Sequence, residues 1–146
     1  MRRLLALVLA AGLLAAGCGD DDNDDGGGSA AKGAPTKTSD DAKIEGADGR
    51  AMVKVATELL DAESGEDPCF AIVASDYVES LGGLDGCAKK LTPLVTGPLD
   101  TITAARPLKG GETGEVQVES SDGSQEQTIK FAKTVSGDWR VDGLGG

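Results

Sequence analysis

Apolar residues follow three different patterns along this chain of 146 residues. Residues 4–16 form one apolar run, and residues 19–43 show no apolar periodicity. From about Ala47 the apolar residues recur every three or four positions, as in an amphipathic helix. After Pro98 they recur every second position, as in a strand with one buried face. The pattern predicts a leader (1–17), a polar segment (18–43) and a single α+β domain (44–146).

Three helical segments are predicted in the first half of the domain. The first begins near Asp48, whose side chain can cap a helix, and ends at Gly65 in a left-handed turn. The second begins at Asp67-Pro68, a capping residue followed by proline, and continues through Tyr77 to Leu81. Breaks follow at Gly82-Gly83 and Gly97-Pro98. The residues expected to face inward are Met52, Val55, Ala56, Leu59 and Ala62, then Cys69, Ile72 and Val73, then Leu84, Cys87, Leu91 and Leu94.

A sheet of four antiparallel strands is predicted in the second half. Tight turns are expected at Asp122-Gly123 and Ser136-Gly137, between alternating segments. We expect Trp139 to be a core anchor of the last strand, and Arg140, its neighbour, to face water. The strands are predicted around Thr101–Arg106, Val116 and Val118, Ile129 and Phe131, and Trp139 and Val141.

The start of the chain has the features of an export signal. Two arginines precede the apolar run of 13 residues, which is shorter than the roughly 17–25 residues of a membrane-spanning helix. Leu14-Ala15-Ala16-Gly17-Cys18 resembles the lipobox of bacterial lipoproteins, with Ala15 where that family usually has Leu. The resemblance implies a signal peptide, a lipid such as palmitate on Cys18, and a protein anchored to the cell membrane outside the cytoplasm. Ordinary secretion and a buried N-terminal helix remain alternatives.

The polar segment is predicted to be an acidic, Gly-rich tether. Asp21-x-Asn23-x-Asp25-Gly26 matches the first half of a calcium-binding EF-hand loop. The twelfth position of that loop requires Glu, but here it is Lys32. We therefore expect a solvated spacer and no metal site.

The charge and composition exclude several functions. The formal net charge is −11, and no basic cluster offsets it, so binding to nucleic acid or to anionic lipid headgroups is disfavoured. The chain also has no histidine, which removes the commonest general base and the commonest metal ligand. We predict no cofactor.

The chain has three cysteines, an odd number for an exported protein. With Cys18 lipidated, Cys69 and Cys87 remain, both on predicted inward faces. Because disulfides persist outside the cytoplasm, we predict a Cys69–Cys87 disulfide. Two buried free thiols are the alternative.

Several short motifs resemble small lipoproteins of Gram-positive bacteria with a nuclear-transport-factor-2-like fold. They are Glu58-Leu59-Leu60, Gly65-Glu66-Asp67-Pro68-Cys69, Tyr77, Leu84-x-x-Cys87 and Gly137-Asp138-Trp139-Arg140-Val141-Asp142. The resemblance implies a cone, in which a bent antiparallel sheet wraps around helices and leaves a pocket. Members of that family are isomerases, dehydratases or binding and accessory proteins.

Two functional hypotheses follow, and a spacer with no ligand is a third possibility. The first is a non-catalytic, lipid-anchored extracytoplasmic binding or accessory domain of the cell envelope, whose partner is a small apolar ligand or an envelope protein. The second is an isomerase or hydro-lyase that acts on a small apolar molecule. Its acid–base groups would be Asp76, Tyr77 and Asp100, which we interpret instead as solvated acids and a ring at the core edge. We assign no catalytic, cofactor-binding or metal-binding residue.

Overall fold

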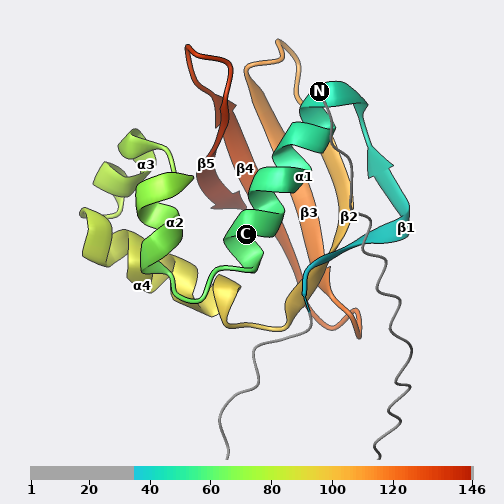
Figure 1. Cartoon of the computed structure of the whole chain (residues 1–146), viewed down its shortest axis with the longest axis horizontal. Coiled ribbons are helices and arrows are strands. Elements are labelled where there is room, and N and C mark those ends of the chain that lie inside the picture. Colours follow the sequence, from blue (N-terminus) through green and yellow to red (C-terminus); the bar gives the residue numbers. More distant parts are fainter. Residues whose placement is uncertain (1–34, 146) are drawn as a thin grey trace, which may run out of the picture. The chain divides into compact units, whose positions relative to one another are not determined.

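The computed structural model of the protein describes residues 35–145, which form an α+β domain. Its helices are α1 (Gly46–Leu60), α2 (Glu66–Ala71), α3 (Ser75–Ser80) and α4 (Leu84–Val95). Its strands are β1 (Lys37–Ile44), β2 (Leu99–Pro107), β3 (Thr113–Ser120), β4 (Glu126–Lys133) and β5 (Trp139–Gly145). The strands form one sheet in the order β1-β2-β3-β4-β5 (Figure 1). The predicted signal peptide, Cys18 and the acidic motif lie outside the described residues.

Strands β2 to β5 confirm the predicted antiparallel meander. Val116 of β3 is opposite Ile129 of β4, and Phe131 of β4 is opposite Val141 of β5. All four side chains are buried, because successive residues of a strand point to opposite faces. The other face carries polar residues such as Lys130, so the sheet has one buried and one wet face.

The predicted number of four strands was wrong, because β1 adds a fifth. Except for Ile44, this strand lies in residues that we assigned to the tether, and it pairs with β2 in parallel. Lys37 and Thr38 pair with β2 at one end and Lys43 and Ile44 at the other, with a register shift between them. Most β1 residues are exposed, so backbone pairing rather than burial holds this strand. The sheet is therefore mixed rather than purely antiparallel.

The predicted second helical segment is two short helices, so the prediction of three segments was also wrong. Residues 72–74 separate α2 from α3 and pair with the edge of β5. The N–H of Val141 donates to the carbonyl of Ile72 at 2.9 Å, and the N–H of Ala74 donates to the carbonyl of Val141 at 2.8 Å. The backbone leaves the helix because its hydrogen bonds are made to the sheet instead.

Both ends of α1 differ from the prediction. The helix begins at Gly46 with Glu45 at the N-cap, so Asp48 lies in the first turn and does not cap. It ends at Leu60, and Gly65 is not left-handed but precedes α2 with a φ of −72°. Gly65 is required for another reason: a Cβ there would lie 2.4 Å from the carbonyl oxygen of Ala88 on α4.

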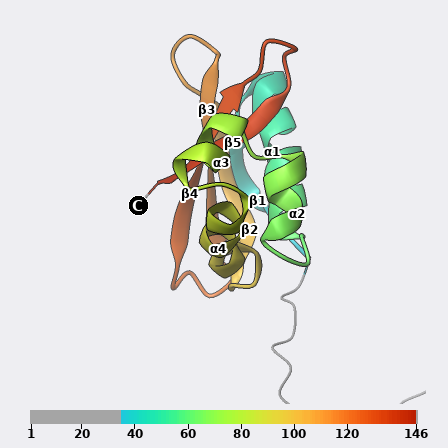
Figure 2. The ribbon, with the colours of Figure 1, turned by 90° about the vertical axis from the view of Figure 1, so that its left-hand side faces the viewer.

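Helix α1 packs against the buried face of the sheet, with its contacts mainly on β2 and β3. Figure 2 shows α1 and α2 on the same side of β3 and β4. Helices α2 and α4 pack against each other beside α1. The core fills the space between helices and sheet; its largest fully buried side chains are Phe131, Met52, Leu59, Leu91, Ile102, Ile129, Val116, Val118 and Val141.

Candidate functional site

A disulfide joins α2 to α4. The structure links Cys69 to Cys87, the pair that the sequence predicts, at a sequence separation of 18. The two cysteines are only 4 % and 0 % exposed. Because a helix of six residues is unstable by itself, this bond and the packing on α4 fix the position of α2.

The outer side of α2 exposes an aromatic ring. Phe70 follows the buried Cys69 by one residue, which turns it about 100° around the helix axis. Its side chain is 71 % exposed, and that of Leu84, the first residue of α4, is 41 % exposed. These two residues line one hollow of about 150 Å³ together with Glu66 and Asp85. We call Glu66, Phe70, Leu84 and Asp85 the Phe70 patch.

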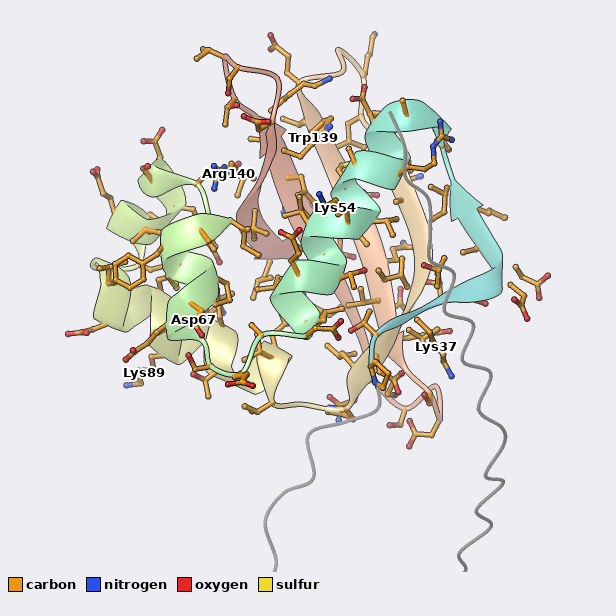
Figure 3. The ribbon with its side chains drawn as sticks, viewed as in Figure 1. Lys37, Lys54, Asp67, Lys89, Trp139 and Arg140 are labelled. Carbon is orange, nitrogen blue, oxygen red and sulfur yellow. A yellow bond between two sulfur atoms is a disulfide. The ribbon has the colours of Figure 1, made fainter. Side chains whose placement is uncertain are left out.

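Two further hollows flank α2. One of 400 Å³ is lined by Phe70 itself, by the start of α3 including Asp76, and by Thr134 and Arg140. Figure 3 shows Arg140 on the side of β5 that is nearest to α2 and α3, whereas Trp139 points toward α1. Arg140 is half-buried rather than fully solvated, because it lines this hollow.

The third hollow, of 360 Å³, lies between α2 and the end of α1. Four of its lining residues are acidic and four are apolar; the full set is Glu58, Asp61, Ala62, Glu63, Asp67, Pro68, Ala71 and Ile72. Neither this hollow nor the smallest one is lined by a lysine or an arginine. The surface around α2 therefore combines exposed apolar atoms with negative charge.

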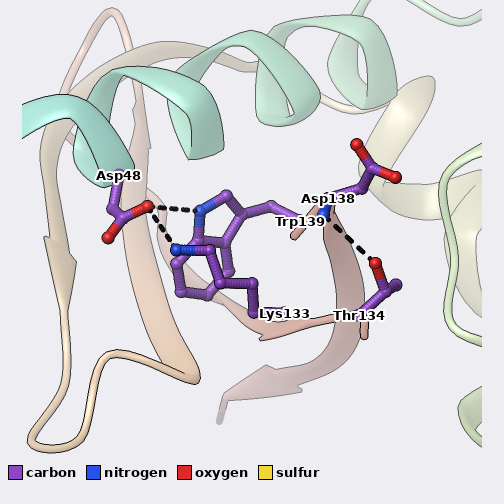
Figure 4. A network of polar contacts seen from close by, with 5 residues as sticks. All are labelled: Asp48, Lys133, Thr134, Asp138 and Trp139. Carbon is purple, nitrogen blue, oxygen red and sulfur yellow. Dashed lines mark hydrogen bonds and ion pairs between the residues drawn. The ribbon is translucent and has the colours of Figure 1, made fainter. Parts of the chain in front are cut away.

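A network of charged and aromatic side chains links α1 to the sheet. Asp48 Oδ1 accepts hydrogen bonds from Lys133 Nζ at 2.8 Å and from Trp139 Nε1 at 3.2 Å (Figure 4). Lys133 Nζ also lies 5.1 Å from the centre of the Trp139 ring. The bond from Lys133, and then that from Trp139, lowers the pKa of Asp48. This network joins the start of α1 to strands β4 and β5, and Trp139 is a core anchor as predicted, 5 % exposed.

A hydroxyl-rich network surrounds the turn between β3 and β4. Ser120 Oγ donates to Asp122 Oδ1 at 2.6 Å, and Ser121 Oγ donates to Asp100 Oδ2 at 2.5 Å. The Ser120 bond, followed by bonds from Ser124, lowers the pKa of Asp122 to about 2. The Ser121 bond lowers the pKa of Asp100. Both carboxylates are therefore held in the charged form.

Replacing Ser120 should move the titration of Asp122. In Ser120→Ala, we expect the pKa of Asp122 to rise from about 2 toward its ordinary value of 3.8, because the main donor to the carboxylate is lost. In the native protein this carboxylate stabilises the fold above pH 3.8 and stops doing so as the pH falls toward 2. NMR titration of the side-chain carboxyl carbon measures the shift.

Ser121→Ala is the matched control, since Ser121 donates to Asp100 instead. It should raise the pKa of Asp100 and leave the main donor to Asp122 in place. If the pKa of Asp122 is the same in Ser120→Ala and in the native protein, the hydrogen bond from Ser120 to Asp122 is contradicted.

The three candidate acid–base groups lie in different surroundings. Asp76 is exposed on α3, beside Phe70 and Arg140. Tyr77 packs against the core, and its burial raises the pKa of the phenol. Asp100 is hydrogen-bonded to Ser121 and to Thr101.

The Phe70 patch was missed by sequence reasoning. Helical spacing placed Leu84 on the inward stripe with Cys87, Leu91 and Leu94, yet Leu84 is exposed. One signal in the sequence could have indicated the exposure of Phe70: it directly follows Cys69, which was expected to face inward, so its side chain points away from the buried face of the helix.

No family model, no curated protein and no solved structure matches this chain. None of the helices in residues 35–145 has both the length and the apolar character needed to cross a membrane. In the same part of the chain, no group of three or more Cys, Asp and Glu side chains is arranged to hold a metal ion.

Proposed function

We propose that the protein is a lipid-anchored, non-catalytic binding or accessory domain of the cell envelope, facing outside the cytoplasm. The observation that carries this proposal is Cys18, directly after the apolar run and Ala16-Gly17. A diacylglycerol on Cys18 supplies two acyl chains, and two are needed for stable membrane anchoring.

The position of β1 shortens the spacer between lipid and domain. The domain begins at Lys37, so residues 19–36 would separate it from the lipidated cysteine. Under this proposal the lipid keeps the domain at the membrane surface, where it can meet envelope proteins.

The domain's architecture supports a nuclear-transport-factor-2-like fold within the same proposal. Helices come before an antiparallel meander in the chain, and α1 covers the buried face of that sheet. Parallel strand β1 is an addition that the resemblance did not imply.

The directions of the pKa shifts of the acidic side chains support a binding role over catalysis. The described carboxylates with a shifted pKa, namely Asp48, Asp100 and Asp122, all have it lowered. A general base near neutral pH usually needs a raised pKa instead. The Phe70 patch offers an exposed aromatic ring, and aromatic residues, Phe included, are enriched at protein interfaces.

Replacing Cys18 should release the protein from the membrane. We expect the native chain to take up a labelled fatty acid and to sediment with membranes. The Cys18→Ala protein should take up no label and lose stable membrane attachment, because the acyl attachment site is gone. Metabolic labelling followed by membrane fractionation measures both effects.

The Cys69→Ala/Cys87→Ala protein is the matched control, because it removes two other cysteines and keeps Cys18. It should retain the label. A Cys18→Ala protein that remains labelled and membrane-bound would refute lipidation at this position.

A further inference from the structure

We propose that the Phe70 patch and the acidic hollow beside it bind a protein segment that carries lysine or arginine next to apolar side chains. The inference rests on the proposed function, since it names the partner of a binding domain, but its test does not depend on the lipid. Three observations on α2 and α4 carry it.

The first observation is an apolar stripe that continues beyond the core. Cys87, Leu91 and Leu94 lie on the buried face of α4 and are at most 5 % exposed. Leu84 belongs to the same stripe by its helical spacing, but it is 41 % exposed and shares a hollow with Phe70. Two large apolar side chains are therefore adjacent on the surface, whereas isolated ones would need no explanation.

The second observation is that the patch is held in place. Pro68 and Cys69 are buried on one side of α2, and the disulfide joins that side to α4. Glu66 and Phe70 project from the other side and are exposed. A partner would therefore meet a surface whose backbone is already ordered, which lowers the entropy lost on binding.

The third observation is charge, which selects the partner. No ion pair within residues 35–145 neutralises Glu66 or Asp85, which flank Phe70. From residue 61 to residue 97 the chain has seven acidic residues and two basic ones, Lys89 and Lys90. A cation next to an apolar side chain can contact an acid and the ring of Phe70 at the same time.

The same charge argues against a second copy of the chain as the partner. Residues 35–145 contain 20 acidic and 11 basic residues, a formal charge of −9. Like charges placed opposite each other disfavour association. Complementarity therefore favours a basic segment.

The test uses the full-length native protein in a neutral detergent and three fluorescent peptides of twelve residues. The first peptide alternates lysine with leucine, the second alternates glutamate with leucine, and the third alternates lysine with serine. Fluorescence anisotropy measures the dissociation constants. We expect the lysine–leucine peptide to bind at least tenfold more tightly than either other peptide, and more weakly at high salt.

Variants locate the binding surface. Phe70→Ala should weaken binding of the lysine–leucine peptide roughly tenfold, as expected for an anchor residue. Glu66→Gln with Asp85→Asn should weaken it and reduce its salt dependence. Val135→Ala is the matched control, because Val135 is another exposed apolar residue but lies in the turn between β4 and β5. It should leave the dissociation constant unchanged.

Three outcomes would overturn the proposal. They are equal affinity for the glutamate–leucine peptide, no binding of the lysine–leucine peptide at millimolar concentration, and unchanged binding in Phe70→Ala. If these occur while the Cys18→Ala protein still leaves the membrane, the lipid anchor stands and only the partner class is wrong. If the lysine–leucine peptide binds as expected but the native chain takes up no fatty acid, the partner class stands and the lipid anchor is wrong.

Discussion

Removing the disulfide with Cys69→Ala and Cys87→Ala should lower the free energy of unfolding by about 3 kcal/mol, the chain-entropy estimate for a loop near this size. The bond closes a loop between cysteines 18 positions apart in the sequence, and this loop includes all of α3. Both cysteines are buried, so part of the loss will come from packing. Urea unfolding followed by circular dichroism measures the difference, which is a large fraction of the roughly 5–15 kcal/mol typical of a domain.

Reduction of the native protein should reproduce most of this loss. The same reductant should leave the Ala pair unchanged, which separates the disulfide from any effect at Cys18. Amide exchange should accelerate in α2 before it does in β3 or β4, because α2 has only six residues and depends on α4 for its position. Equal stability of the reduced and oxidised proteins would show that the disulfide does not hold the fold.

The meander was predictable because its signal is local. In β3, β4 and β5 the buried side chains alternate with polar ones, and this alternation is a direct consequence of strand geometry. The turns at Gly123 and Gly137 were predictable too, because a polar residue followed by glycine favours a tight turn. Both glycines have the positive φ values that such turns require, 68° and 92°. Each feature is encoded within a few neighbouring residues.

Strand β1 and the break between α2 and α3 could not be predicted in this way. The segment Lys37–Ile44 has little apolar pattern and is ordered by backbone pairing to β2, about sixty residues later in the chain. Val73 leaves the helical path to pair with Val141. Backbone hydrogen bonds have no side-chain signature, so sequence periodicity cannot reveal them.

The predicted roles of some residues were wrong for a similar reason. Asp48 is a residue type that commonly caps helices. Its hydrogen-bond partners are instead Lys133 and Trp139, which are 85 and 91 residues away in the sequence. Leu84 has the helical spacing of a core residue, yet it is exposed at the start of α4. Of the candidate site, the sequence predicted the disulfide pair, whereas the exposure of Phe70 depends on which side of α2 meets α4.

Phe131→Ala should be the most damaging single core substitution, with an expected loss of about 3–5 kcal/mol in the free energy of unfolding. Phe131 is the largest of the fully buried side chains and is 1 % exposed, on a central strand between β3 and β5. Truncation would remove its buried surface and leave a cavity next to Val141 on β5. Urea unfolding at neutral pH measures the loss.

Phe70→Ala is the matched control, since it makes the same chemical change on a ring that is 71 % exposed. Its free energy of unfolding should stay within about 0.5 kcal/mol of the native value. The pair therefore separates the two roles of phenylalanine in this domain, because only Phe131 supports the core while only Phe70 is available to a partner. A Phe70→Ala protein as unstable as Phe131→Ala would place Phe70 in the core and remove the binding surface.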